Sequence, residues 1–141
     1  MAGDEKLLSR QLRETLDYIR GNYKVVYMAV ADSLIGFGVI TRGGGRNIFC
    51  SSRDIVLRSL FVRPDARGKG YGRMLVQVLA TGCGLKHEKV YAYIRPDNDA
   101  SIKTALANGF AKVGTATYKG LLKRIVLSKN GSVDIYRKDN K

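Results

Sequence analysis

The stretch that decides the fold is Leu57–Leu75, which reads LRSLFVRPDARGKGYGRML. The apolar run over residues 55–63 predicts a strand that ends at Pro64, and the glycine-rich segment then opens a helix expected over about residues 70–82. Glycines let backbone N–H groups approach an anion, and the N-terminus of a helix favours negative charge. The stretch therefore predicts an anion-binding turn, although an ordinary turn with incidental glycines is the alternative. Its spacing matches neither the P-loop nor the dinucleotide-binding fingerprint.

The rest of the chain alternates between helical and strand patterns. Residues 4–20 have the spacing of an amphipathic helix, and residues 23–30 and 34–41 predict a hairpin that a glycine loop at 43–45 follows. The elements expected after the glycine-rich segment are a strand at 89–94, a helix capped by Asn98 or Asp99 and ended by Asn108-Gly109, a strand near 111–118, and a hairpin of 125–129 with 132–137 around Asn130-Gly131. This order predicts one mixed α/β domain spanning residues 1–141.

The composition limits the class of protein. A chain of 141 residues with 45% hydrophobic content can build a single core without cross-links. Two cysteines in unrelated contexts, Cys50 and Cys83, and one histidine, His87, suggest neither a zinc site nor a disulfide, so no metal is expected. The sequence has no apolar run of membrane-spanning length and no signal-peptide pattern, so we expect a cytoplasmic protein without a membrane partner.

The charge is high for a small domain. Twenty-five Lys and Arg residues against 12 Asp and Glu give a net charge of +13. This excess indicates an anionic partner, either a phosphate-rich cofactor or nucleic acid, with solvated surface charge as the alternative. No motif with interleaved aromatic residues supports RNA binding specifically.

Two motifs resemble the signatures of the GNAT family of N-acetyltransferases. In that family a strand is followed by Arg/Gln-x-x-Gly-x-Gly/Ala at the start of a helix, and Arg67, Gly70 and Gly72 match these positions. A second signature, an Asn that opens a helix ending in Gly-Phe, is matched by Asn98 and by Asn108-Gly109-Phe110. The resemblance covers roughly residues 23–116.

The resemblance implies a central, mixed, mostly antiparallel sheet flanked by helices and splayed between the family's fourth and fifth strands. These are the third and fourth strands expected here, since the front end is abbreviated to one helix. It also implies acetyl-CoA or another acyl-CoA as cofactor. The pantetheine arm would pair with backbone groups of the third strand, and the pyrophosphate would lie on the glycine-rich segment. The cofactor-binding residues implied are Leu60, Phe61, Val62, Arg67, Gly68, Lys69, Gly70, Tyr71, Gly72, Arg73, Asn98 and Ser101.

The sequence departs from the family at the general acid. Many members have a tyrosine that reprotonates the leaving thiolate, and here that position is Ala105. Water or another phenol would have to replace it, with Tyr118 and Tyr93 ranked ahead of Tyr71. The carboxylates available as a general base are Asp54 and Asp97.

The function implied is direct transfer of an acetyl group from acetyl-CoA to an amine by an acyl-CoA-dependent N-acyltransferase. The abbreviated front end predicts an open acceptor site, or one completed by a second subunit in a homodimer. The sequence does not identify the acceptor. The positive charge suggests an amine linked to nucleic acid, either on an aminoacyl-tRNA or on a DNA base. The alternative is a non-catalytic domain that binds acyl-CoA or nucleic acid.

Overall fold

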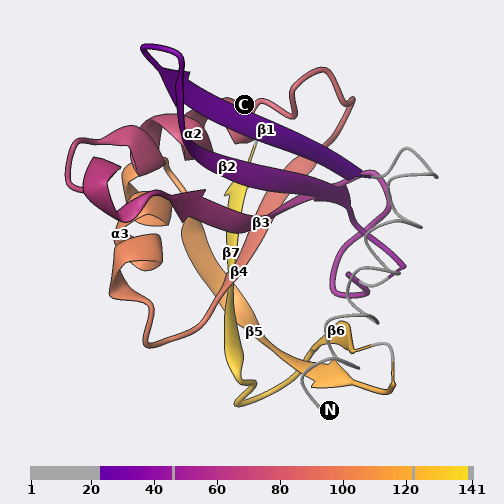
Figure 1. Ribbon diagram of the computed structural model, residues 1–141. Coiled ribbons are helices and arrows are strands. Elements are labelled where there is room, and N and C mark those ends of the chain that lie inside the picture. The colour runs from indigo at the N-terminus through magenta and orange to yellow at the C-terminus, as the bar shows by residue number, and fades with distance from the viewer. Residues whose placement is uncertain (1–22, 46, 122, 140–141) are drawn as a thin grey trace.

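The computed structural model describes residues 23–45, 47–121 and 123–139, so the helix expected over residues 4–20 lies outside the described part (Figure 1). The described residues form one seven-stranded sheet in the order β1-β2-β3-β4-β7-β5-β6. The strands are β1 (Tyr23–Val30), β2 (Ser33–Arg42), β3 (Ile55–Val62), β4 (Lys89–Ile94), β5 (Ala111–Lys119), β6 (Arg124–Leu127) and β7 (Val133–Asp139). Among them, only β3 and β4 pair in parallel, which confirms the expected mixed, mostly antiparallel sheet.

Two helices, α2 (Tyr71–Leu79) and α3 (Asp99–Ala107), pack on one side of the sheet, which we call the inner face (Figure 1). The main core lies between these helices and the sheet, with fully buried Ile40, Ile55, Leu75 and Leu79. A smaller apolar cluster lies on the opposite side, the outer face, around β5, β6 and β7, and it includes Tyr91 and Tyr93. Side chains along β4 alternate between the two clusters, as a strand requires.

The sheet splays between β3 and β4, as expected. The two strands pair only through residues 55–57 and 90–92. Just beyond, Phe37 lies opposite Phe61 but Val39 lies opposite Arg58, so β3 carries one extra residue relative to β2. Ser59 in this bulge has a φ of 56°, an uncommon conformation for a residue other than glycine. A bulge bends its strand, and here the bend carries β3 away from β4.

The prediction that residues 125–129 and 132–137 pair as a hairpin is wrong. Strands β6 and β7 both pair with β5, where Ala116 lies opposite Leu127 on one side and Val133 on the other. A turn does form, since Asn130 has a φ of 55° and the Gly131 amide donates to the Thr115 hydroxyl. However, a Cβ on Gly131 would lie 2.2 Å from the Ala116 carbonyl oxygen, so the turn carries the chain across the backbone of β5 instead of back along β6.

The other local expectations hold with small shifts in boundaries. Strands β1 and β2 form the expected hairpin, and Ala31 and Asp32 both have the positive φ that a two-residue turn of type I′ requires. Helix α2 ends at Leu79 and not at residue 82, because the chain turns there and Gly82 adopts a left-handed conformation. Among the described residues, none of the helices has the length and apolar content needed to cross a membrane.

Candidate functional site

The glycine-rich turn exposes an uncapped helix N-terminus. A short 3-10 helix, Pro64–Ala66, leads from β3 into the turn, where Gly68 and Gly70 have φ values of 79° and 85°. Gly70 is the N-cap of α2 and provides no side-chain hydrogen bond to it. The first backbone N–H groups of a helix have no partner within the helix. The start of α2 therefore presents donors and a partial positive charge to whatever lies in front of it.

A cavity of about 480 Å³, here called the loop cavity, lies in front of this turn. It contains eleven of the twelve residues expected to bind the cofactor, and Lys69 is the one that does not line it. Its walls are Leu60, Phe61, Val62, Ala66, Arg67, Gly68, Gly70, Tyr71, Gly72, Arg73, Asn98, Ala100, Ser101 and Thr104. Arg67, Arg73 and the uncapped N-terminus of α2 suit this cavity to a phosphate-bearing ligand.

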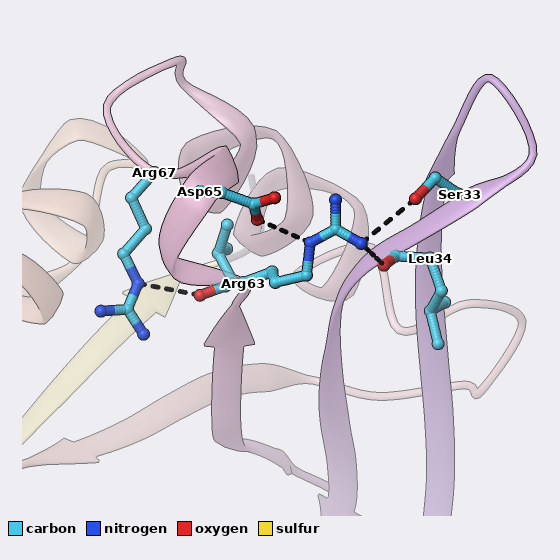
Figure 2. Close-up of polar contacts among 6 residues, drawn as sticks. Ser33, Leu34, Arg63, Asp65 and Arg67 are labelled. Carbon is cyan, nitrogen blue, oxygen red and sulfur yellow. Dashed lines mark hydrogen bonds and ion pairs between the residues drawn. The ribbon is translucent and has the colours of Figure 1, made fainter.

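Two arginines fasten the turn to its surroundings (Figure 2). Arg67 donates from Nε to the Val62 carbonyl oxygen at 2.8 Å, and its guanidinium carbon lies 5.8 Å from the centre of the Phe61 ring. Arg63 donates to Asp65 at 2.6 Å and to Ser33 Oγ at 3.2 Å, which ties the turn to the start of β2. The hydrogen bond from Arg63 holds the pKa of the Asp65 carboxyl below its ordinary value. The cavity wall is thus braced from two sides.

A second cavity of about 310 Å³, the splay cavity, lies where β3 and β4 separate. Its walls come from both faces of the sheet: Ala105 and Phe110 belong to the inner-face core, and Tyr93 and Val133 to the outer-face cluster. The full lining is Leu57, Ser59, Leu60, Val76, Ala92, Tyr93, Ile94, Arg95, Asn98, Ser101, Ala105, Phe110, Tyr118 and Val133. This cavity shares Leu60, Asn98 and Ser101 with the loop cavity, so the two adjoin at the splay.

The expected acid–base residues divide into those that reach a cavity and those that do not. Tyr118 and Tyr93 line the splay cavity together with Ala105, whereas Tyr71 lines the loop cavity. Asp54 lines neither cavity, since its carboxylate accepts hydrogen bonds from the backbone N–H groups of Ser51 and Lys89 at the far end of β3.

Asp97 also lies outside both linings and forms an exposed ion pair with Arg95 at 3.2 Å. Neither carboxylate expected as a general base is therefore brought to a cavity wall.

Asn98 connects the two cavities and also caps α3. Its Oδ1 accepts a hydrogen bond from the Ser101 backbone N–H at 3.2 Å. Sequence reasoning missed Ser59 and Arg95 as wall residues. The position of Arg95 directly after a strand that borders the splay could have indicated it, but a serine in a left-handed bulge leaves no sequence signal.

The Cys50 thiol lacks the features of a nucleophile. Among the described residues, no group of three His, Cys, Asp or Glu side chains is placed to hold a metal ion. Burial, and then the charge of Asp54, raise the pKa of the Cys50 thiol to about 12, so this thiol is protonated at neutral pH.

The sequence model of the acetyltransferase (GNAT) family matches residues 4–110. The chain belongs to this family. No curated protein matches the sequence significantly. Membership identifies the chain as an acyl-CoA-dependent N-acetyltransferase.

Solved structures with the same fold include several acetyltransferases. An acetyltransferase from Thermus thermophilus superposes with a TM-score of 0.67 at 19% identity, covering 93% of this chain and 71% of the other. The ribosomal-protein-alanine N-acetyltransferase from Brucella melitensis superposes with a TM-score of 0.65 at 21% identity, covering 94% of this chain and 78% of the other. The protein yncA from Salmonella typhimurium, solved with its cofactor acetyl-CoA, superposes with a TM-score of 0.60 at 22% identity, covering 96% of this chain and 72% of the other. At these identities the likeness shows the shared fold.

Proposed function

We propose that this GNAT member transfers an acyl group, acetyl in the simplest case, from acyl-CoA in the loop cavity to an amine that enters the splay cavity from the outer face. The observation that carries the proposal is the meeting of the two cavities at Leu60, Asn98 and Ser101. One cavity has the donors and charges that suit a pyrophosphate, and the other opens across the sheet. Cofactor and acceptor could thus meet from opposite faces.

The loop cavity fits the cofactor in shape and charge. The uncapped N-terminus of α2 and the N–H groups of the glycine turn would hold the pyrophosphate, with Arg67 and Arg73 adding charge. Beyond residue 57, β3 has no β4 partner, so the backbone of Leu60 at this open edge is placed to pair with an extended pantetheine arm, whereas that of Phe61 faces β2. When bound, acyl-CoA supplies the acyl group activated as a thioester. A solved relative of the same fold, yncA, has acetyl-CoA as its cofactor.

The chain's own residues would stabilise charge and move protons at the splay. Backbone N–H groups released by the bulge at Ser59 are suited to donate to a carbonyl oxygen as an amine attacks it. Such donors act most strongly in a site that excludes water, and buried Ala105 and Phe110 keep part of the cavity apolar.

We assign the general acid to Tyr118. Tyr118 lines the cavity that Ala105 also lines, and position 105 is where many family members carry the tyrosine. Tyr93 lines the same cavity, but its ring packs edge-on against Phe49 at 6.5 Å within the outer-face cluster, which suits a wall residue. With Asp54 and Asp97 outside both cavities, deprotonation of the amine falls to solvent in this proposal.

The acceptor we propose is an amine linked to nucleic acid, on an aminoacyl-tRNA or a DNA base. The net charge of +13 exceeds what one cofactor site needs, and the lining of the splay cavity includes Tyr93 and Val133 from the outer-face cluster.

The direct test is thiol release from acetyl-CoA with a panel of amines that includes an aminoacyl-tRNA, a DNA oligonucleotide and free small amines. Sustained release with any amine, many turnovers per protein, is expected. The nucleic-acid assignment requires faster release with a nucleic-acid-linked amine than with the matching free amine. Absence of release with every acceptor, under conditions where acetyl-CoA demonstrably binds, would reject the catalytic proposal.

A further inference from the structure

Three aromatic side chains form a row across the outer face of the sheet, one from each of β1, β2 and β3. Tyr27 lies opposite Phe37, and Phe37 lies opposite Phe61. The ring centroids are 6.4 Å apart in the first pair and 5.7 Å apart in the second. We call Tyr27, Phe37 and Phe61 the aromatic row. Phe61 is distant in sequence from Tyr27 and Phe37, so only the pairing of β2 with β3 reveals the whole row.

The aromatic row points away from the helices. Val26 and Met28, the neighbours of Tyr27, pack against the inner-face core, so Tyr27 faces the other way. A Cβ on Gly38 would point at Leu79 of α2, which places Phe37 on the outer face as well.

The aromatic row is open to solvent at both ends. Tyr27 is 64% exposed and Phe61 is 43% exposed. Single exposed apolar side chains are ordinary, but a contiguous row is a mark of a binding surface.

Positive charge accompanies the aromatic row. The guanidinium of Arg67 lies over the Phe61 ring at 5.8 Å. Arg63 follows Phe61 by two residues, and its N–H group continues the pairing to Ile35, so it lies on the same side of the extended chain. Its guanidinium is ion-paired with Asp65, so Arg67 contributes most of the local positive charge. Figure 2 shows both guanidinium groups at this end of β3. The whole chain carries a net charge of +13.

Aromatic rings on an open sheet, flanked by arginines, are a common means of binding single-stranded nucleic acid. Each base offers a face for stacking, and the cations neutralise phosphates. Duplex nucleic acid has its bases stacked on each other and cannot use such rings without unpairing.

We propose that the aromatic row is a binding platform for a single-stranded segment of nucleic acid, whose bases stack on Tyr27, Phe37 and Phe61. This inference rests on the acyl-transfer function proposed above and narrows its acceptor to a nucleic acid with an unpaired segment. The aromatic row ends at Phe61, which also lines the loop cavity. A strand held on the platform would end beside the loop cavity, next to Leu60, where the loop cavity adjoins the splay cavity.

The test is binding of a labelled oligouridine and a labelled oligothymidine, each of about 10 nucleotides, measured by fluorescence anisotropy at low salt with the full chain. The variants change Tyr27, because it lines neither cavity and its exposure makes misfolding a small risk. Tyr27→Ala is expected to weaken binding about tenfold. Tyr27→Phe keeps the ring and should bind like the intact chain, whereas Tyr27→Leu should behave like Tyr27→Ala. Leu127→Ala changes an apolar position on β6 that is 56% exposed, and this matched control should leave the affinity unchanged.

Several results would overturn the platform. Unchanged affinity in Tyr27→Ala, or wild-type affinity in Tyr27→Leu, would remove stacking as the cause. If duplex DNA bound as tightly as the single-stranded oligonucleotides, and Tyr27→Ala did not weaken its binding, charge alone would account for the affinity. A homodimer in size-exclusion chromatography that Tyr27→Ala dissociates would assign the aromatic row to a second copy of the chain instead. Tighter binding of oligouridine than of oligothymidine would identify RNA as the nucleic acid that the aromatic row binds, and the reverse order would identify DNA.

The same variants separate this proposal from the acyl-transfer proposal. Thermal stabilisation by acetyl-CoA should be equal in the intact chain and in Tyr27→Ala, because Tyr27 is outside the loop cavity. If acetyl-CoA stabilised neither protein while oligonucleotide binding still depended on the Tyr27 ring, the enzyme proposal would fail and the platform would stand.

Discussion

The loop cavity and the splay cavity adjoin at three residues but are built in different ways. Most walls of the loop cavity come from one continuous segment, residues 60–73, and its donors are largely backbone N–H groups. The splay cavity takes its walls from four strands and both helices. A cradle made by local backbone conformation should be sensitive to changes within its own loop. A pocket assembled from distant elements should also respond to packing far from its walls.

The largest expected effect that separates the two cavities is on Tyr118. Tyr118→Phe should lower kcat for acetyl transfer by about 100-fold or more, because it removes the proposed proton donor. The KM for acetyl-CoA should stay unchanged, because Tyr118 does not line the loop cavity. Steady-state thiol-release kinetics measures both quantities.

The matched control for this change is Tyr93→Phe, which removes a phenol oxygen from the same cavity and should leave kcat close to that of the intact chain. An unchanged kcat in Tyr118→Phe would reassign the proton transfer to water. A large loss in Tyr93→Phe alone would exchange the roles of the two tyrosines.

Packing beneath β5 should affect the splay cavity more than the loop cavity. Gly131→Ala would place a Cβ 2.2 Å from the Ala116 carbonyl oxygen, so the chain must shift. The free energy of unfolding should fall by about 2 kcal/mol in denaturant titrations. Since β5 carries Tyr118, kcat should fall by a larger factor than the affinity for acetyl-CoA.

Gly114→Ala is the control, because this glycine of β5 has an ordinary φ and its new Cβ would have its nearest contact at 4.0 Å. Equal losses in kcat and in cofactor affinity for Gly131→Ala would remove the distinction drawn between the cavities.

The smallest effect concerns the brace between Arg63 and Asp65. Arg63 lowers the pKa of the Asp65 carboxyl, so this group stabilises the fold at pH values above its ordinary pKa of 3.8. That contribution is lost as the pH falls through the lower pKa of the folded state. In Arg63→Ala the pKa of Asp65 should rise toward 3.8 in an NMR titration.

The affinity for acetyl-CoA should fall only a few-fold in Arg63→Ala, because exposed ion pairs contribute little. Arg53→Ala breaks an exposed ion pair with Glu88, outside both cavities, and is the control. A pKa of Asp65 that did not move would contradict the assigned cause of its shift.

The same contrast explains what the sequence could predict. The loop cavity follows from a local pattern, since a strand, a glycine turn and a helix in direct succession fix their own geometry. Its expected residues line the cavity apart from Lys69. The turn at Asn130-Gly131 was also predictable, but its strand partners were not, because the insertion of β5 depends on the close approach of Gly131 to Ala116.

Non-local features left weaker signals or none. The aromatic row joins three strands by their register, which the spacing along the chain does not reveal. Asp54 was a reasonable general base from its place before β3, yet its carboxylate is occupied by the backbone N–H groups of Ser51 and Lys89.

The most direct test of the account is thermal unfolding with and without excess acetyl-CoA, on the intact chain, Gly70→Glu and Gly45→Glu. Position 70 has a φ of 85° at the start of α2, so a glutamate there would strain the turn and repel phosphate. Gly45 also has a positive φ and open space around it but lies outside both cavities, so it controls for strain and added charge. We predict that acetyl-CoA raises the midpoint of the intact chain and of Gly45→Glu, and leaves Gly70→Glu unchanged. No rise in the intact chain at saturating acetyl-CoA, or an equal rise in Gly70→Glu, would contradict the assignment of the loop cavity as the cofactor site.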